Sequence, residues 1–369
     1  MYNKKWIVIK TGRQNKMKIY SKKILLFLLI TALALTLTAC GGDQAQNDSA
    51  ESLPDEINFG ILRVPNDQTI AIAEGFFDDY FTERGIEVNT RVFDSGVEAN
   101  QALASGSIDF ATMGNTNAIT ALARDLNVEL IWIHEVLGEN EALAVKNDSG
   151  IEEVEDLIGE RIAVPFASTA HYILLNVLKE AGIEEDVQLL DMQTAEIVAA
   201  WERGDVKAAY TWQPTLAQLL KSGYTLTDSK EMADKGYITA NVDVVRKNFS
   251  DKYPELVADF ISALNKAGNI YRNDPEKAAK IAGDKLGLET EVALHQMQGT
   301  TWKTREELLS SEFFGTANEP GNFAEIMKDT SDFLQAQGSI EESPSQAAFN
   351  EYVNPEYIKM SLENDQTNY

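Results

Sequence analysis

The stretch ERIAVPFASTAHYILL, residues 160–175, joins an apolar run to a segment whose apolar residues favour a helix. The run RIAVPF predicts a buried strand, and Ser168 opens the helix that follows. The N–H groups at a helix start can bind an anion without the glycines of a nucleotide loop, and Ser168 and Thr169 add two hydroxyl donors. The alternative is that these two hydroxyls only cap the helix.

Strands and helices alternate on both sides of this junction. The pattern predicts strands at 56–62, 87–93, 108–114, 127–136, 142–146, 161–166, 187–192, 208–212 and 225–229. It predicts helices at 70–85, 96–106, 115–125, 151–159, 194–205 and 214–223, then an extended segment at 237–249 and a helical C-terminal third. Such alternation is typical of an α/β fold with mostly parallel sheets. Two consecutive series predict two lobes with a cleft, where ligands bind at the carboxyl ends of strands.

Composition limits what the chain can be and bind. Its 369 residues suffice for two lobes of ordinary domain size, and 44% of them are apolar, so a large core is expected. Cys40 is the sole cysteine, which excludes a disulfide within the chain. The three histidines are scattered and lack a thiolate partner, so we expect neither a metal site nor a cofactor.

The N-terminus has the features of an export signal. Residues 1–23 hold eight basic residues and no acidic residue, and residues 24–35 are nearly all apolar. Met17 is a possible alternative start to Met1, because the segment from Met17 onward is a complete signal by itself. We predict a signal segment at 1–39 and a flexible tether at 40–54, which is small and polar.

The chain is strongly acidic. It has 58 Asp and Glu against 32 Lys and Arg, a net charge of −26. Loss of residues 1–39 would leave 24 basic residues, for a net charge of −34. Nucleic acid is therefore excluded as a partner, since phosphate contacts need clustered Lys and Arg. Any bound anion must be held by local dipoles against the overall field.

Several segments resemble one family in unbroken order over most of residues 90–250. They include VFDSGVEANQALASGSIDFATMGNTNAI, DLIGERIAVPFASTAHYILLNVLKEAGI, IVAAWERGDVKAAYTWQPTLAQL and VDVVRKNF. These segments are similar to those of the taurine-binding proteins of ABC importers, within the wider nitrate and sulfonate group. The resemblance implies a type II periplasmic-binding-protein fold whose ligand lies between two lobes. Lobe 1 would hold residues 55–141 and 241–360, and lobe 2 residues 142–240.

The sequence LTAC, residues 37–40, resembles the lipobox of bacterial lipoproteins. This resemblance implies cleavage before Cys40 and a diacylglycerol on its sulfur; the alternative is a buried apolar cysteine in an ordinary signal. The expected protein is a monomer, anchored by lipid on the extracytoplasmic face of the cell membrane. Its partners would be a small sulfonate ligand and the permease subunit of an ABC importer.

The resemblance also implies which residues bind the ligand. Taurine carries a sulfonate and an ammonium, so its site needs N–H and O–H donors at one end and a carboxylate or aromatic face at the other. The residues expected at the sulfonate are Asn115, Thr116, Ser168, Thr169 and His171. Those expected at the ammonium are Trp212, Glu141 and Asp243. Related taurine binders show an acid at the position of Asn241, and Asp243 on the same strand face could replace it.

Other interpretations remain open at the level of sequence. The ligand could be an alkanesulfonate, nitrate or another small zwitterion. The same superfamily contains enzymes similar to thiamine-pyrimidine synthases, for which His171 would be the reactive group. Capping alone for Asn115 and packing alone for His171 and Trp212 are the structural alternatives. Asn66 and Asp67, just after the first strand, are further candidates for the cleft.

Overall fold

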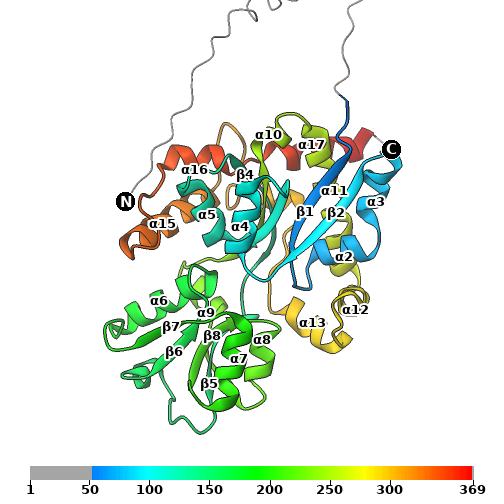
Figure 1. Ribbon diagram of the computed structural model, residues 1–369. Coiled ribbons are helices and arrows are strands. Elements are labelled where there is room, and N and C mark those ends of the chain that lie inside the picture. Colours follow the sequence, from blue (N-terminus) through cyan, green and yellow to red (C-terminus); the bar gives the residue numbers. More distant parts are fainter. Residues whose placement is uncertain (1–51, 368–369) are drawn as a thin grey trace, which may run out of the picture. The chain divides into compact units, whose positions relative to one another are not determined.

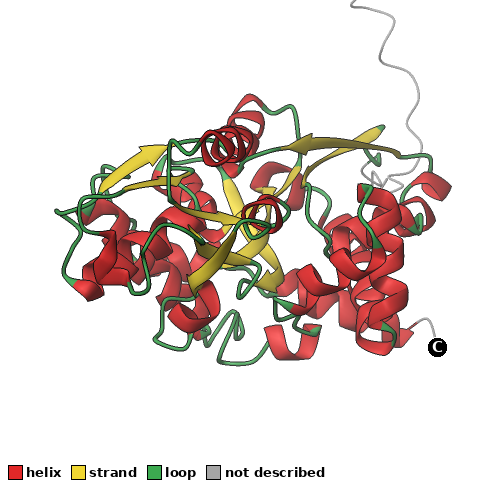
Figure 2. Ribbon diagram, turned by 90° about the horizontal axis from the view of Figure 1, so that it is seen from below, coloured by secondary structure: helices red, strands yellow, loops and turns green. Residues whose placement is uncertain are grey.

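The computed structural model describes residues 52–367, which form two five-stranded sheets with helices packed around them (Figure 1). The predicted signal segment, Cys40 and nearly all of the predicted tether lie outside the described residues. Figure 2 shows the strands lying between helices. Within residues 52–367, the chain has no helix with the length and apolar character needed to cross a membrane.

The first sheet has the strand order β2-β1-β3-β10-β4. Its strands are β1 (Glu56–Leu62), β2 (Glu87–Phe93), β3 (Phe110–Gly114), β4 (Val128–Val136) and β10 (Ala240–Arg246). The strand β1 pairs in parallel with β2 and β3, whereas β10 runs antiparallel to both β3 and β4. The chain therefore returns to this sheet through β10 after it has built the second sheet.

The second sheet has the strand order β7-β6-β8-β5-β9. Its strands are β5 (Glu141–Lys146), β6 (Arg161–Val164), β7 (Gln188–Asp191), β8 (Ala208–Trp212) and β9 (Gly223–Asp228). The strand β6 pairs in parallel with β7 and β8, and β5 runs antiparallel to β8 and β9. Figure 1 shows this sheet and its helices in green, grouped apart from β1, β2 and β4. The lobe boundaries at residues 141 and 241 stay predictions.

The expectation of mostly parallel sheets holds for four of the five strands in each sheet and misses the fifth. Each sheet is mixed, because the strand that follows a crossing between the sheets, β5 or β10, is inserted antiparallel to its neighbours. Both crossing strands are buried along most of their length, as are β3, β4 and β8 beside them. Periodicity reports burial of a strand and says nothing of its direction, so the sequence could not show this.

Helices cover the sheets and form most of the chain after β10. They are α2 (Asp67–Ala73), α3 (Phe76–Tyr80), α4 (Gly96–Ser105), α5 (Asn115–Ala123), α6 (Thr169–Ala181), α7 (Thr194–Arg203), α8 (Thr215–Leu219), α9 (Ser229–Ala233), α10 (Lys247–Ser250), α11 (Pro254–Asn273), α12 (Pro275–Leu286), α13 (Thr290–Gln298), α14 (Arg305–Leu308), α15 (Asn322–Ala336), α16 (Gln346–Tyr352) and α17 (Glu356–Thr367). Short 3₁₀ helices occupy Thr82–Arg84 and Val154–Leu157.

The single helix predicted at 70–85 is wrong. The chain breaks there into α2 and α3 at Gly75, whose φ of 72° lies in the left-handed region. The break lets Phe77 stack against Phe260 of α11 with ring centroids 5.3 Å apart, and Phe260 lies 4.5 Å from Phe110 of β3. This aromatic cluster joins the early helices and the C-terminal helices to one core on the first sheet.

Candidate functional site

A cavity of about 180 Å³ lies between the two sheets. Its walls are formed where β1, β2, β3, β6, β7 and β8 end and where the antiparallel strands β5 and β10 begin. The carboxyl ends of parallel strands are where open α/β sheets bind ligands, because helix N-termini point there. The cavity therefore occupies the position that the alternation of strands and helices predicts.

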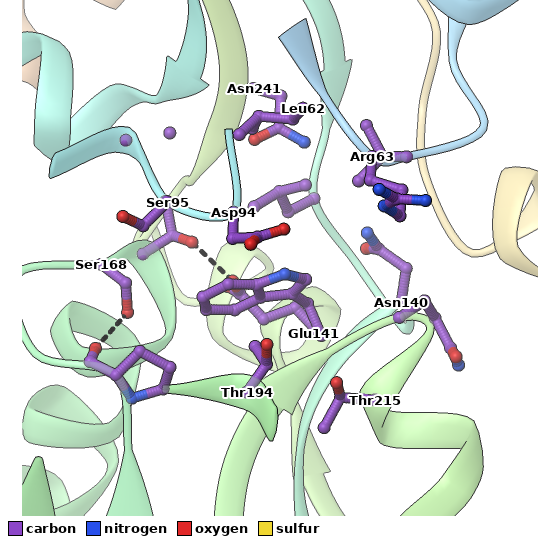
Figure 3. A pocket seen from close by; sticks show the side chains of 18 of the residues that line it. Leu62, Arg63, Asp94, Ser95, Asn140, Glu141, Ser168, Thr194, Thr215 and Asn241 are labelled. Carbon is purple, nitrogen blue, oxygen red and sulfur yellow. Dashed lines mark hydrogen bonds between the residues drawn. The ribbon is translucent and has the colours of Figure 1, made fainter. Parts of the chain in front are cut away.

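Four helices of nine or more residues begin at the cavity. The helices α4, α6 and α7 start next to the lining residues Ser95, Ser168 and Gln193, and α5 starts after the lining residue Gly114. Each start presents N–H groups without an acceptor in its own helix and a partial positive charge. Figure 3 shows Ser95, Ser168 and Thr194 on one side of the pocket, with Arg63 and Asn140 on the other. The first side suits an anion.

Ser168 caps α6. Its hydroxyl accepts from the His171 N–H at 3.1 Å. It donates to the Pro165 carbonyl at 2.6 Å (Figure 3). Thr169 beside it donates its hydroxyl to Glu141 Oε2 at 2.5 Å. Both side chains line the cavity, yet both hydroxyl hydrogens are already engaged in the protein. An anion at this helix start would therefore meet the backbone N–H groups first.

Asn115 and Thr116 are buried at the start of α5 and do not belong to the cavity wall. Asn115 Oδ1 accepts from the backbone N–H of Ala240 at 3.3 Å, which fastens α5 to β10. Gly114 lines the cavity in their place. A Cβ at Gly114 would lie 2.8 Å from Thr169 Cγ2, so the absence of a side chain lets the two sheets' segments approach closely.

His171 is not among the lining residues of the cavity, but it stacks on the lining residue Phe166, with ring centroids 4.4 Å apart and planes 8° from parallel. Burial lowers the pKa of its imidazole to about 4, so the ring is neutral at physiological pH. A neutral, stacked histidine outside the wall has the properties of the packing alternative. The ligand role of this residue stays a prediction.

Glu141 is a buried carboxylate at the first position of β5, and it lines the cavity. Thr169 donates to its Oε2 at 2.5 Å, and Ser229 donates to its Oε1 at 2.8 Å. Burial raises the pKa of its carboxyl to about 7, although both hydroxyl donors lower it. Trp212, the last residue of β8, pairs with Glu141 in the sheet and lines the cavity with it.

Asp243 lies below the cavity rather than in its wall. Its carboxylate is 0% exposed, and its Oδ2 lies 3.0 Å from His134 Nε2. His134 Nδ1 in turn lies 2.5 Å from Asp67 Oδ1, and Asp67 also accepts from Trp132 Nε1 at 2.8 Å. Burial by itself lowers the pKa of His134, but the two carboxylates raise it well above the usual value. Asp243 thus neutralises an interior imidazolium.

Asn241 lies where the ammonium partner was expected, and a residue that sequence reasoning missed lies beside it. Glu135 of β4 pairs with Asn241 across the ladder, accepts from its Nδ2 at 2.6 Å and lines the cavity. Asp94 and Arg63 also line the cavity and were missed. Both follow directly on a strand end, so the rule that placed Ser168 could have found them.

The Asn117 side chain crosses the cavity region from α5. Its Nδ2 donates to the carbonyl of Ala167 at 2.8 Å, and Ala167 has a φ of 56°. This bond links the segment after β3 to the segment after β6. Across residues 52–367, His, Cys, Asp and Glu side chains form no group of three or more suited to a metal ion.

Comparison with known proteins shows the family of this chain. The family model described as NMT1/THI5 like matches residues 70–278. The chain belongs to the NMT1/THI5-like family. It is 35% identical over 293 residues to the taurine-binding periplasmic protein of Escherichia coli (strain K12), which covers 75% of this chain and 85% of that protein.

Solved structures share the fold. The periplasmic aliphatic sulphonate binding protein SsuA from Escherichia coli matches with a TM-score of 0.68 at 19% identity, over 83% of this chain and 100% of that chain. The desulfurization enzyme DSZB matches with a TM-score of 0.62 at 19% identity, over 85% of this chain and 100% of that chain. The NMT1/THI5-like chain thus has the two-lobed α/β fold of the periplasmic binding proteins. Because an enzyme has this fold too, function must be argued from the site.

Proposed function

We propose that the protein is the extracytoplasmic substrate-binding lipoprotein of an ABC importer and captures taurine or a related aliphatic sulfonate. The observation that supports this most is the convergence of four helix N-termini on one cavity in a chain of net charge −26. Such dipoles hold an anion without a lysine or arginine cluster. The taurine-binding relative supports the choice of ligand.

The sulfonate lies at the starts of α4 and α6 in this proposal. Backbone N–H groups beside Ser168 and Thr169 donate to its oxygens, and Gly114 lets the segment after β3 approach Thr169 closely. Asn115 and His171 act indirectly, since their hydrogen bonds hold the starts of α5 and α6 in place; Thr116 is buried next to Asn115, outside the cavity wall. The ligand binds by hydrogen bonds to charged oxygen, which are stronger than neutral ones.

The ammonium lies toward the β5, β8 and β10 edges of the cavity. Trp212 offers an indole face to the cation, and Glu141 supplies negative charge from beneath it. Asp243 contributes through His134, because it is not part of the cavity wall. A simple sulfonate or nitrate would use the anion side alone.

Delivery requires two further steps. Cys40 carries the lipid that keeps the protein at the outer surface of the cell membrane, and the monomeric liganded form docks on the permease. Closure of the two lobes around the ligand prepares that form. Asn117, which bonds to Ala167 across the cavity region, would fasten the closed arrangement.

Isothermal calorimetry on the purified protein tests the proposed ligand. We expect taurine to bind with greater affinity than ethanesulfonate, and ethanesulfonate with greater affinity than nitrate. Heat with nitrate but none with either sulfonate would move the protein to another ligand class. Turnover of a sulfonate to a desulfonated product would replace binding with catalysis. Incorporation of labelled fatty acid in cells, and its loss in Cys40→Ala, tests the anchor.

A further inference from the structure

The wall formed by β4 and β10 carries a carboxylate that is only half satisfied. Glu135 lines the cavity, is 3% exposed, and accepts from Asn241 Nδ2 through its Oε1 at 2.6 Å. Its Oε2 is buried and makes no hydrogen bond within 3.5 Å to the described part of the chain; the Asn66 side chain, whose Nδ2 also has no partner, lies close enough to lower the pKa of this carboxyl. An unsatisfied charged oxygen is costly, so a donor offered by a ligand in the cavity would stabilise it.

Glu141, the other buried glutamate of the cavity, differs in this respect. Both of its oxygens accept hydroxyl hydrogens, from Thr169 and from Ser229. Glu135 is therefore the carboxylate that is free to accept from a ligand. The side chain of Asn241 supports this role, because its amide donor fixes one oxygen and leaves the other directed elsewhere.

The surroundings of Glu135 favour a cation. Behind it lie Asp67 of α2 and Asp243 of β10, with the imidazole of His134 between them. Asn66 of α2 and Asn241 of β10, both uncharged, also face it. The remaining charged residues of the cavity wall are Arg63, Asp94 and Glu141. Arg63 makes no ion pair within 4.0 Å among the residues that the structure describes, so it forms no direct contact with the Glu135 carboxylate.

We propose that Glu135 Oε2, oriented by Asn241, accepts the ammonium hydrogens of the ligand and makes the site selective for aminated over non-aminated sulfonates. This inference rests on the proposed function, because it assumes that the ligand's anionic end lies at the helix starts. Glu135 and Asn241 would together distinguish aminated from non-aminated sulfonates, which the anion side of the cavity cannot do.

Proton release should accompany the binding of an aminated ligand. Burial, together with the charge of Asp67, raises the pKa of Glu135 to about 7, although the charge of His134 and the amides of Asn241 and Asn66 lower it. Part of the free protein is therefore protonated at this carboxyl at neutral pH. An ammonium favours the ionised form, so its binding displaces that proton, and affinity for taurine falls roughly tenfold per pH unit below about 7.

The first test compares two ligands on Glu135→Gln. This variant keeps the size of the side chain and removes its charge. We expect taurine affinity to fall roughly 10- to 100-fold, as for loss of a hydrogen bond to a charged group, while ethanesulfonate affinity stays within about threefold. Glu139→Gln is the matched control, since it removes one negative charge from an exposed position four residues further on. Equal losses for both ligands in Glu135→Gln would overturn the assignment.

The second test uses the wild-type protein and does not depend on a variant that folds. Calorimetry of taurine binding at pH 7, in buffers that differ in ionisation enthalpy, measures the protons released. We expect release with taurine, little or none with ethanesulfonate, and no release with taurine in Glu135→Gln. Release that persists in Glu135→Gln and disappears in Glu141→Gln would overturn the proposal in favour of Glu141. If neither sulfonate binds the wild-type protein, the proposed function fails, and this inference fails with it.

Discussion

Replacement of His134 by glutamine should destabilise the protein strongly, because the imidazole is clamped between two buried carboxylates. His134 Nδ1 lies 2.5 Å from Asp67 Oδ1 and His134 Nε2 lies 3.0 Å from Asp243 Oδ2. The side chains of His134 and Asp243 are 0% exposed and that of Asp67 is 3% exposed, so water cannot take over either contact. Removal of the charged partner of a buried pair typically costs about 3–5 kcal/mol.

Asp67 keeps other donors in the variant, whereas Asp243 keeps few. Asp67 still accepts from Trp132 Nε1 and from the Gln68 N–H. The Thr112 hydroxyl lies 3.4 Å from Asp243 Oδ2 but only 2.6 Å from Gln68 Oε1, so its hydrogen is directed to Gln68. We therefore expect a loss toward the middle of that range, about 4 kcal/mol, borne mainly by Asp243.

Urea unfolding followed by circular dichroism at pH 7 measures this loss. The double variant with Asp243→Asn should recover at least about 1 kcal/mol relative to His134→Gln, because the uncompensated charge is then removed. The control is Glu139→Gln, a substitution at an exposed position. Gly150→Ala would not serve as a control, because Gly150 has a φ of 75° and an alanine there would be strained. A loss below about 1 kcal/mol with no coupling to Asp243 would refute the account of this network.

Four further outcomes follow from the site. Ser168→Ala should lower the free energy of unfolding by about 1 kcal/mol through loss of the α6 cap, measured by urea unfolding; an unchanged midpoint would contradict the cap. Gly114→Ala places a Cβ 2.8 Å from Thr169 Cγ2 and should weaken all sulfonates several-fold in calorimetry, whereas unchanged affinity would show that the close approach is not needed. Trp212→Ala should weaken taurine more than ethanesulfonate, and equal losses would remove its ammonium role. Because the pKa of Glu141 is raised to about 7, the folded protein binds the extra proton, so the contribution of this residue, about 3 kcal/mol, is present below pH 4.5 and lost as pH rises to about 7. Glu141→Gln should make the fall in stability over this range smaller and leave the part due to Glu135, whereas an identical slope in both proteins would contradict the shift.

The alternation of strand patterns with helix patterns along the sequence was enough to predict most elements of the fold. The strand Arg161–Val164, the cap at Ser168 and the helix that follows all occur where the pattern places them. The break at Gly75 was missed, because a glycine inside an apolar period marks a break only if the chain uses its left-handed conformation. The antiparallel crossing strands were missed as well, since burial on both faces gives the same pattern in either direction.

The site was predictable in position and less so in its residues. The rule that ligands lie at strand ends selected Ser168 and Thr169, and the family resemblance added Glu141 and Trp212; all four line the cavity. It could not separate Asn241 from Asp243, because both face the same way along β10 and only their depth below the edge differs. Glu135 was missed for a related reason: an acid in an apolar strand has no sequence feature that distinguishes a structural ion pair from a ligand contact.

A crystal of the protein with taurine, measured at a wavelength where sulfur scatters anomalously, tests the central claim most directly. The account predicts a sulfur peak beside the starts of α4 and α6, near Ser95 and Ser168, with the ammonium directed to the β4–β10 wall. A peak beside Glu135 and Asn241 would place the sulfonate at the opposite end of the cavity, and a peak outside the cavity would remove the site altogether; either result would contradict the account.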